Sequence, residues 1–82
     1  MENNLRTSGM VRETRGQNGQ MVYRVQTVNQ FFQYTAPKHQ DAEALERSRA
    51  YACADLERQL GEANLTIGDL IPSTDPRGVN LK

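Results

Sequence analysis

Residues 10–28, MVRETRGQNGQMVYRVQTV, decide the fold that this sequence predicts. They contain two runs in which polar and apolar residues alternate, residues 10–15 and residues 21–28, with Asn18-Gly19 between them. Alternation with a period of two is typical of β-strands, and an Asn-Gly pair supplies the two positive-φ positions of a type I′ turn. We therefore predict a β-hairpin that turns at Asn18 and Gly19.

The predicted turn also sets which residues of the two strands face each other. With those two residues at its centre, Glu13 lies opposite Arg24, and Arg12 lies opposite Val25. Glu13 and Arg24 would then form a favourable cross-strand pair. Every assignment of a residue to one face of the sheet depends on this register, because a slip of one residue moves a side chain to the other face.

A third alternating run, residues 31–36, predicts a three-stranded antiparallel meander, and a two-residue turn at Asn29-Gln30 would place Val25 opposite Tyr34. One face of the meander is apolar and is expected to form the core: Met10, Met21, Tyr23, Val25, Phe32, Tyr34 and Ala36. The other face holds Glu13, Arg15, Arg24, Gln26, Gln33 and Thr35, with Val11, Val22, Val28 and Phe31 toward its margins. Arg12 falls on the apolar face, and we expect its guanidinium to reach solvent past an edge strand.

Residues 41–60 predict a helix, with Asp41 as its N-cap and Gly61 as the residue that stops it. Apolar and small residues recur along it at intervals of three and four: Ala42, Leu45, Ala52, Cys53, Leu56 and Leu60. This stripe would cover the apolar face of the sheet. The expected fold is α+β, a three-stranded antiparallel β-meander packed on one α-helix in the order β-β-β-α.

The remaining segments are shorter. We expect a flexible N-terminus over residues 1–8, a domain over residues 9–62 and a C-terminal extension over residues 63–82. The extension predicts a short helical turn begun by Thr66, followed by an extended tail from residue 73. Its apolar residues, Leu65, Ile67, Leu70 and Ile71, can either cover the open end of the core or form a contact with a partner or a second copy.

Composition points to one small domain with a thin core. Hydrophobic residues make up 37% of the 82 residues, and ten basic residues balance ten acidic ones. Residues 1–40 carry the basic excess and residues 41–82 the acidic excess, a pattern that an acidic solvated helix also produces. No apolar run is long enough to span a membrane and no signal peptide precedes the domain, so we expect a cytoplasmic protein.

The side chains available for chemistry are few. His39 is the only histidine and Cys53 the only cysteine, so one chain cannot assemble a common zinc site, and we predict no metal or cofactor. Cys53 lies on the apolar stripe, where packing is its expected role. The glycines form no phosphate-binding pattern, and a domain this small has little room for a water-excluding pocket. We therefore expect a protein that is not an enzyme.

Tyr23-Arg24-Val25 in the middle strand, Asp41-Ala42-Glu43-Ala44 at the helix start and Ala50-Tyr51 in its middle resemble two DNA-binding modules. These are the plant ethylene-response-factor-type domain and the arm-binding domain of tyrosine recombinases, and the resemblance covers residues 10–62. Both families read the DNA major groove with a three-stranded sheet. The resemblance implies a small accessory protein of a mobile element or phage.

Carried onto this chain, the resemblance implies contacts to base edges from Arg15, Arg24, Gln26 and Gln33, and contacts to phosphates from Arg12 and Lys38. A protein-binding module or small inhibitor is the alternative function. It would use an edge strand, the C-terminal apolar segment or the strand margin, with Val28, Phe31, Leu65, Ile67, Leu70 and Ile71 as contacts, and could be a homodimer.

Overall fold

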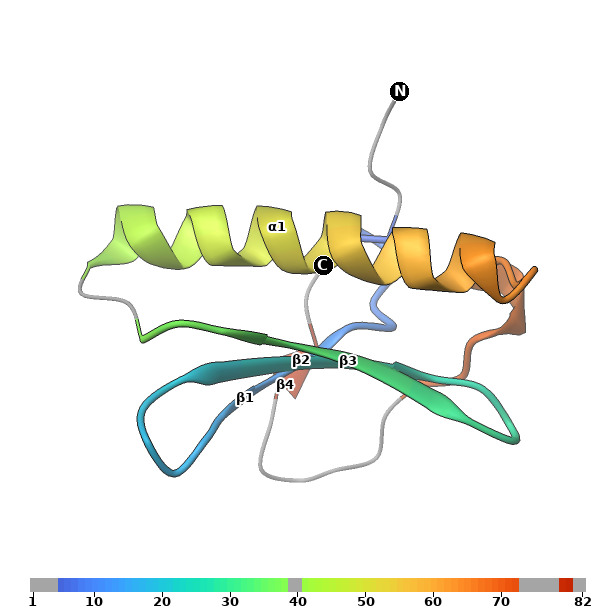
Figure 1. Cartoon of the computed structure of the whole chain (residues 1–82), viewed down its shortest axis with the longest axis horizontal. Coiled ribbons are helices and arrows are strands. Elements are labelled where there is room, and N and C mark those ends of the chain that lie inside the picture. The colour runs from blue at the N-terminus through green and yellow to red at the C-terminus, as the bar shows by residue number, and fades with distance from the viewer. Residues whose placement is uncertain (1–4, 39–40, 73–78, 81–82) are drawn as a thin grey trace.

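The computed structural model describes residues 5–38, 41–72 and 79–80, and these form two layers (Figure 1). One layer is a sheet with the strand order β3-β2-β1-β4. The strands are β1 (Arg12–Arg15), β2 (Met21–Gln26), β3 (Phe31–Ala36) and the short β4 (Val79–Asn80). The other layer is helix α1 (Ala42–Glu62), which is followed by a 3₁₀ turn, η1 (Ile67–Asp69). The predicted α+β fold and its β-β-β-α order are confirmed.

The first hairpin turns differently from the prediction. Its loop has three residues, 17–19, because the Gly16 N–H donates to the Gln20 carbonyl at 2.6 Å and the Gly19 N–H donates to the Gly16 carbonyl at 3.1 Å. Gly19 has a φ of 83°, whereas Asn18 has no positive φ. This is the pattern of a turn followed by one left-handed glycine, the common three-residue hairpin loop.

The predicted register of β1 is therefore wrong by one residue. Glu13 lies opposite Tyr23, and Arg12 lies opposite Arg24. Because successive side chains of a strand point to opposite faces, the slip exchanges the faces of β1. Glu13 and Arg15 belong to the side that α1 covers, and Arg12 belongs to the outer face, so its predicted place on the apolar face is also wrong.

The second hairpin is shifted by two residues, so Val25 pairs with Phe32 rather than with Tyr34. The loop closes where the Thr27 N–H donates to the Gln30 carbonyl at 2.8 Å. A shift of two changes the partners but leaves each side chain on its own face. The faces predicted for the residues of β2 and β3 are thus confirmed.

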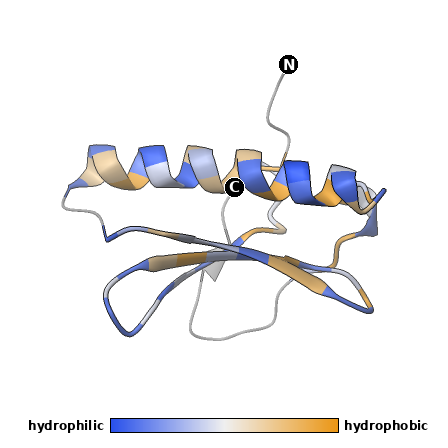
Figure 2. Cartoon of the chain, in the orientation of Figure 1, coloured by the Kyte–Doolittle hydropathy of each residue, from blue (hydrophilic) through white to orange (hydrophobic). Residues whose placement is uncertain are grey.

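The core lies between the sheet and α1, and hydrophobic and hydrophilic residues alternate along both layers (Figure 2). Its buried members are Leu5, Val11, Met21, Tyr23, Val25, Ala36, Ala52, Cys53, Leu56, Leu60 and Leu70. Phe32 and Tyr34 are half-buried against them, as is Leu45 from the predicted helix stripe. Ala42, at the first turn of α1, is exposed and stays outside the core.

Helix α1 begins where the sequence predicts and ends slightly later. The Asp41 side chain accepts a hydrogen bond from the Ala44 N–H at 2.8 Å, so Asp41 is the N-cap. Gly61 lies inside the helix rather than after it. The left-handed residue that follows the C-terminus is Asn64, with a φ of 61°.

Segments on both sides of the expected domain belong to it. Leu5 is fully buried, so residues 5–8 are not a separate flexible terminus. Leu70 is buried in the core, and the Ile71 N–H donates to the Gln26 carbonyl at 2.9 Å. Val79 and Asn80, expected in an extended tail, pair with β1 as a fourth strand. His39 and residues 1–4, 73–78 and 81–82 lie outside the described residues.

Candidate nucleic-acid interface

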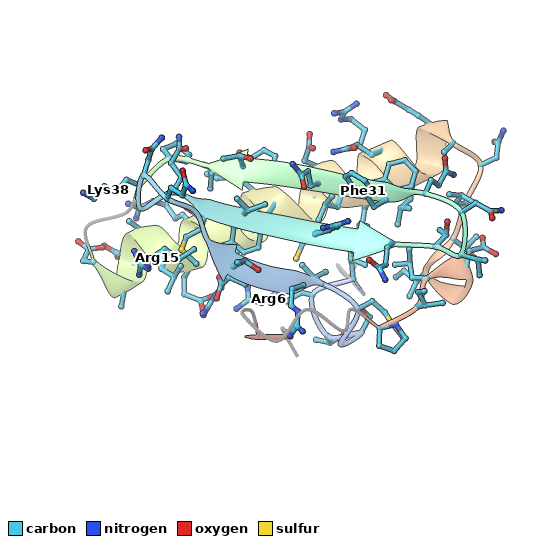
Figure 3. All side chains as sticks on the ribbon, turned by 90° about the horizontal axis from the view of Figure 1, so that it is seen from below. Arg6, Arg15, Phe31 and Lys38 are labelled. Carbon is cyan, nitrogen blue, oxygen red and sulfur yellow. The ribbon has the colours of Figure 1, made fainter. Side chains whose placement is uncertain are left out.

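The candidate interface is the outer face of the sheet, which α1 does not cover (Figure 3). Directly opposed residues form three rows across this face, namely Ile71–Gln26–Phe31, Arg12–Arg24–Gln33 and Thr14–Val22–Thr35. Residues that face each other across antiparallel strands project to the same side. Among the described residues, these rows contain two arginines and two glutamines but no carboxylate.

The carboxylates that form ion pairs belong to α1 and to the inner side of β1. The ion pairs are Arg6–Glu46, Arg47–Glu43, Arg49–Glu13, Arg49–Glu46, Arg58–Asp55 and Arg58–Glu62. Three cations, Arg15, Arg24 and Lys38, form no ion pair with any residue that the structure describes. All three are candidate nucleic-acid contacts from the sequence. Positive charge is thus left uncompensated on the sheet and its ends, and not on α1.

Arg24 is the central residue of the middle row. Its guanidinium carbon lies 4.2 Å from the centre of the Phe31 ring, the geometry of a cation–π contact. Its Nε is buried and has no hydrogen-bond partner among the described residues. Phe31 itself remains 54% exposed. Arg24 and Phe31 therefore form a preorganised surface, and no carboxylate in the described part of the chain neutralises its charge.

Beside this pair the surface is hollowed by about 300 Å³, and the hollow is lined by residues 26–31 together with Arg24 and Ile71. Strand β1 pairs only with the first four residues of β2. Ile71 pairs with Gln26, beyond the end of β1, and so lies beside the hollow. The loop that forms one wall is held by the Thr27 hydroxyl oxygen. This oxygen accepts hydrogen bonds from the backbone N–H groups of Asn29, at 3.3 Å, and Gln30, at 3.2 Å. Residues far apart in the sequence thus build one small open pocket.

Arg15 and Lys38 lie away from this pocket, at the opposite end of the sheet from Phe31 (Figure 3). Arg15 is exposed at the end of β1, on the side of the sheet that faces α1. Lys38 follows β3, and its aliphatic stem runs so close to Gly19 that a Cβ there would lie 3.2 Å from Lys38 Cε. These two cations flank the face rather than belong to its rows.

The structure therefore unites four of the six predicted nucleic-acid contacts on one face: Arg12, Arg24, Gln26 and Gln33. Arg12 is only 9% exposed, so it offers little surface for contact. Of the alternative partner contacts, Leu70 is buried, and Leu65 and Ile67 pack against the core. Val28, Phe31 and Ile71 line the hollow.

Sequence reasoning missed a buried ion pair between the layers. Arg49 Nε donates to Glu13 Oε2 at 2.8 Å, and a second guanidinium nitrogen donates to Oε1 at 2.9 Å. Burial opposes ionisation of Glu13, but the hydrogen bonds and charge of Arg49 hold its pKa below the usual value. The signal in the sequence was the position of Arg49, four residues after Leu45 and three before Ala52, inside the apolar stripe.

Two buried side chains of the core show no sign of reactivity. Burial raises the pKa of the Cys53 thiol to about 11, so the thiolate is scarce at neutral pH. Burial and the nearby Glu13 charge raise the pKa of Tyr23, whose hydroxyl has no hydrogen-bond partner among the described residues. The described part of the chain brings no three metal-ligating side chains together. It also contains no helix of the length and hydrophobicity needed to cross a membrane.

Comparison of the chain with known protein families, curated proteins and solved structures found no match. Its function therefore has to be inferred from the geometry and charge of the outer sheet face.

Proposed function

We propose that this chain is a small, cytoplasmic, non-enzymatic module that binds duplex DNA through the outer face of its sheet. The observation that carries this proposal is the distribution of ion pairs. Carboxylates neutralise the arginines on and around α1, whereas Arg24, Arg15 and Lys38 have no acidic partner among the described residues. A polyanion supplies the missing negative charge.

The chemistry of the rows fits both parts of a DNA interface. A guanidinium such as that of Arg24 pairs with phosphate or with the edge of guanine, and the amides of Gln26 and Gln33 match the edge of adenine. The major groove is wide enough to admit a two-stranded β-ribbon. The resemblance of residues 10–62 to sheet-reading DNA-binding modules points in the same direction.

A net charge of zero does not argue against this function, because charge is separated between the layers. Glu13, which the predicted register placed beside Arg24, lies on the other side of the sheet and is paired with Arg49. The field that approaching DNA experiences is set by the charges it faces, and the carboxylates of α1 lie behind the sheet.

The test is fluorescence anisotropy with a labelled duplex over a series of salt concentrations. Arg24→Gln should weaken binding by roughly tenfold and lower the slope of log affinity against log salt by about one. Arg47→Gln, which removes one positive charge from the outer side of α1, is the matched control and should leave both quantities unchanged. Equal losses in the two variants, or no salt-sensitive binding by the wild type, would contradict the proposal.

One observation favours protein recognition as a second candidate function. Val28 is 82% exposed at the tip of the second hairpin and, with Phe31 and Ile71, gives the hollow an apolar margin. Such a margin suits an apolar side chain of a partner or a second copy. In that case light scattering should detect a complex that Val28→Ser dissociates, and a strictly monomeric protein without a partner would count against it.

A further inference from the structure

We infer that the hollow at the second hairpin is a seat for one unpaired nucleobase. This inference rests on the proposed function and sharpens it. The preferred ligand would be a nucleic acid in which duplex adjoins an unpaired nucleotide, with the duplex along the rows of the sheet and the unpaired base against Phe31.

The first argument is the exposed aromatic ring. Phe31 keeps 54% of its surface open even though the Arg24 guanidinium carbon lies 4.2 Å from the centre of its ring. Unpaired bases stack on aromatic rings and on guanidinium planes, and each such stack strengthens binding by roughly tenfold. Bases inside a duplex present only their edges, so a ring face is useful to a base that has left the stack.

The second argument is the lining of the hollow. Ile71 and Val28 give it an apolar part, and Gln26 and Asn29, which also line it, carry amide side chains. An apolar surface with a few hydrogen-bonding groups matches a base, which has flat faces and polar edges. The uncompensated charge of Arg24 lies next to it and suits the phosphate of the same nucleotide. An apolar peptide side chain would leave that charge without a partner.

The experiment compares three labelled DNA ligands of one sequence: a blunt duplex, the duplex with a short thymidine overhang, and the duplex with an overhang of abasic sites. The abasic overhang carries the same phosphates without bases. Wild-type protein should bind the thymidine overhang roughly tenfold more tightly than the other two ligands. Phe31→Leu should remove this advantage, so that this variant binds the thymidine overhang no more tightly than the abasic overhang.

Tyr51→Leu is the matched control, because Tyr51 is an aromatic residue that is 64% exposed on α1, and this variant should keep the advantage. Equal affinity for the abasic and thymidine overhangs would overturn the inference while leaving the proposed function intact. The same holds if Phe31→Leu keeps the preference for thymidine. Failure of the wild type to bind any of the three ligands would overturn both.

Discussion

Among single residues, Arg49 connects three parts of the fold, and only its place inside the apolar stripe of the helix indicates this role in the sequence. It crosses from α1 to the buried carboxylate of Glu13 with two short hydrogen bonds and also contacts Glu46, which holds Arg6. One side chain thus connects the helix, the first strand and the N-terminal segment. A buried ion pair of this kind costs desolvation energy, so its loss is felt mainly through the charge that is left behind.

Arg49→Met should lower the free energy of unfolding by about 3 kcal/mol, because Glu13 would remain buried without a partner. Urea denaturation followed by circular dichroism measures this change. The matched control is Arg47→Met, since Arg47 forms an exposed ion pair with Glu43 and should change stability little.

The double variant Glu13→Leu/Arg49→Met removes both charges and keeps apolar volume between the layers. It should be more stable than Arg49→Met alone. A double variant as unstable as the single one would show that the cost arises from lost packing and not from the unpaired carboxylate.

The pKa values of Glu13 and Asp55 predict that acid destabilises the fold. Burial opposes ionisation of Glu13, but Arg49 lowers its pKa, and hydrogen bonds from Arg58 and Gln59 lower the pKa of Asp55. A carboxyl whose folded pKa is depressed contributes stability above its unfolded pKa, and this contribution is lost as the pH falls through the folded value. The urea midpoint should be level from pH 7 to about 5 and should fall below about pH 4. A midpoint that rises on acidification would contradict this.

At the scale of elements, the sequence predicted the second and third strands better than the first. Residues 21–28 and 31–36 alternate over enough positions to fix their faces, whatever the length of the turn between them. The first hairpin carries glycines at 16 and 19, so loops of two and three residues are both allowed locally. The choice depends on burying Val11 and on pairing Glu13 with Arg49, and both depend on a helix that lies far along the chain.

In the candidate site too, the residues of β2 and β3 could be predicted from the sequence and those of β1 could not. Arg24, Gln26 and Gln33 lie on strands whose faces could be predicted, and they lie where they were expected. Arg12 and Arg15 lie on the slipped strand and exchanged sides. The hollow could not be predicted because Ile71 enters it from a segment that follows α1 and pairs with Gln26.

The end of α1 offers a prediction about a single element. The Leu65 N–H donates to the Leu60 carbonyl at 2.8 Å across Asn64, whose φ is 61°, so the helix closes in a Schellman motif. Asn64→Ala should lower the free energy of unfolding by about 1 kcal/mol, whereas Asn64→Gly should be neutral or stabilising, because glycine adopts positive φ without strain. Thermal melts of the two variants measure this, and a glycine variant as unstable as the alanine one would refute the assignment.

For the whole molecule, the central feature is the separation of charge between two layers. The arginines of α1 are paired with carboxylates, whereas the described rows of the outer sheet face contain Arg24 and no carboxylate. A protein with no net charge can therefore present a locally positive surface. The account of function depends on that surface being the one that meets nucleic acid.

The most direct measurement is a titration of ¹⁵N-labelled protein with a DNA duplex, followed by amide chemical shifts. Shifts should concentrate in β2, β3 and the loop over residues 27–30, leave the exposed side of α1 unchanged, and fade as salt is added. Shifts confined to α1, or spectra that do not respond to DNA at low salt, would contradict the assignment of the outer sheet face as the binding surface.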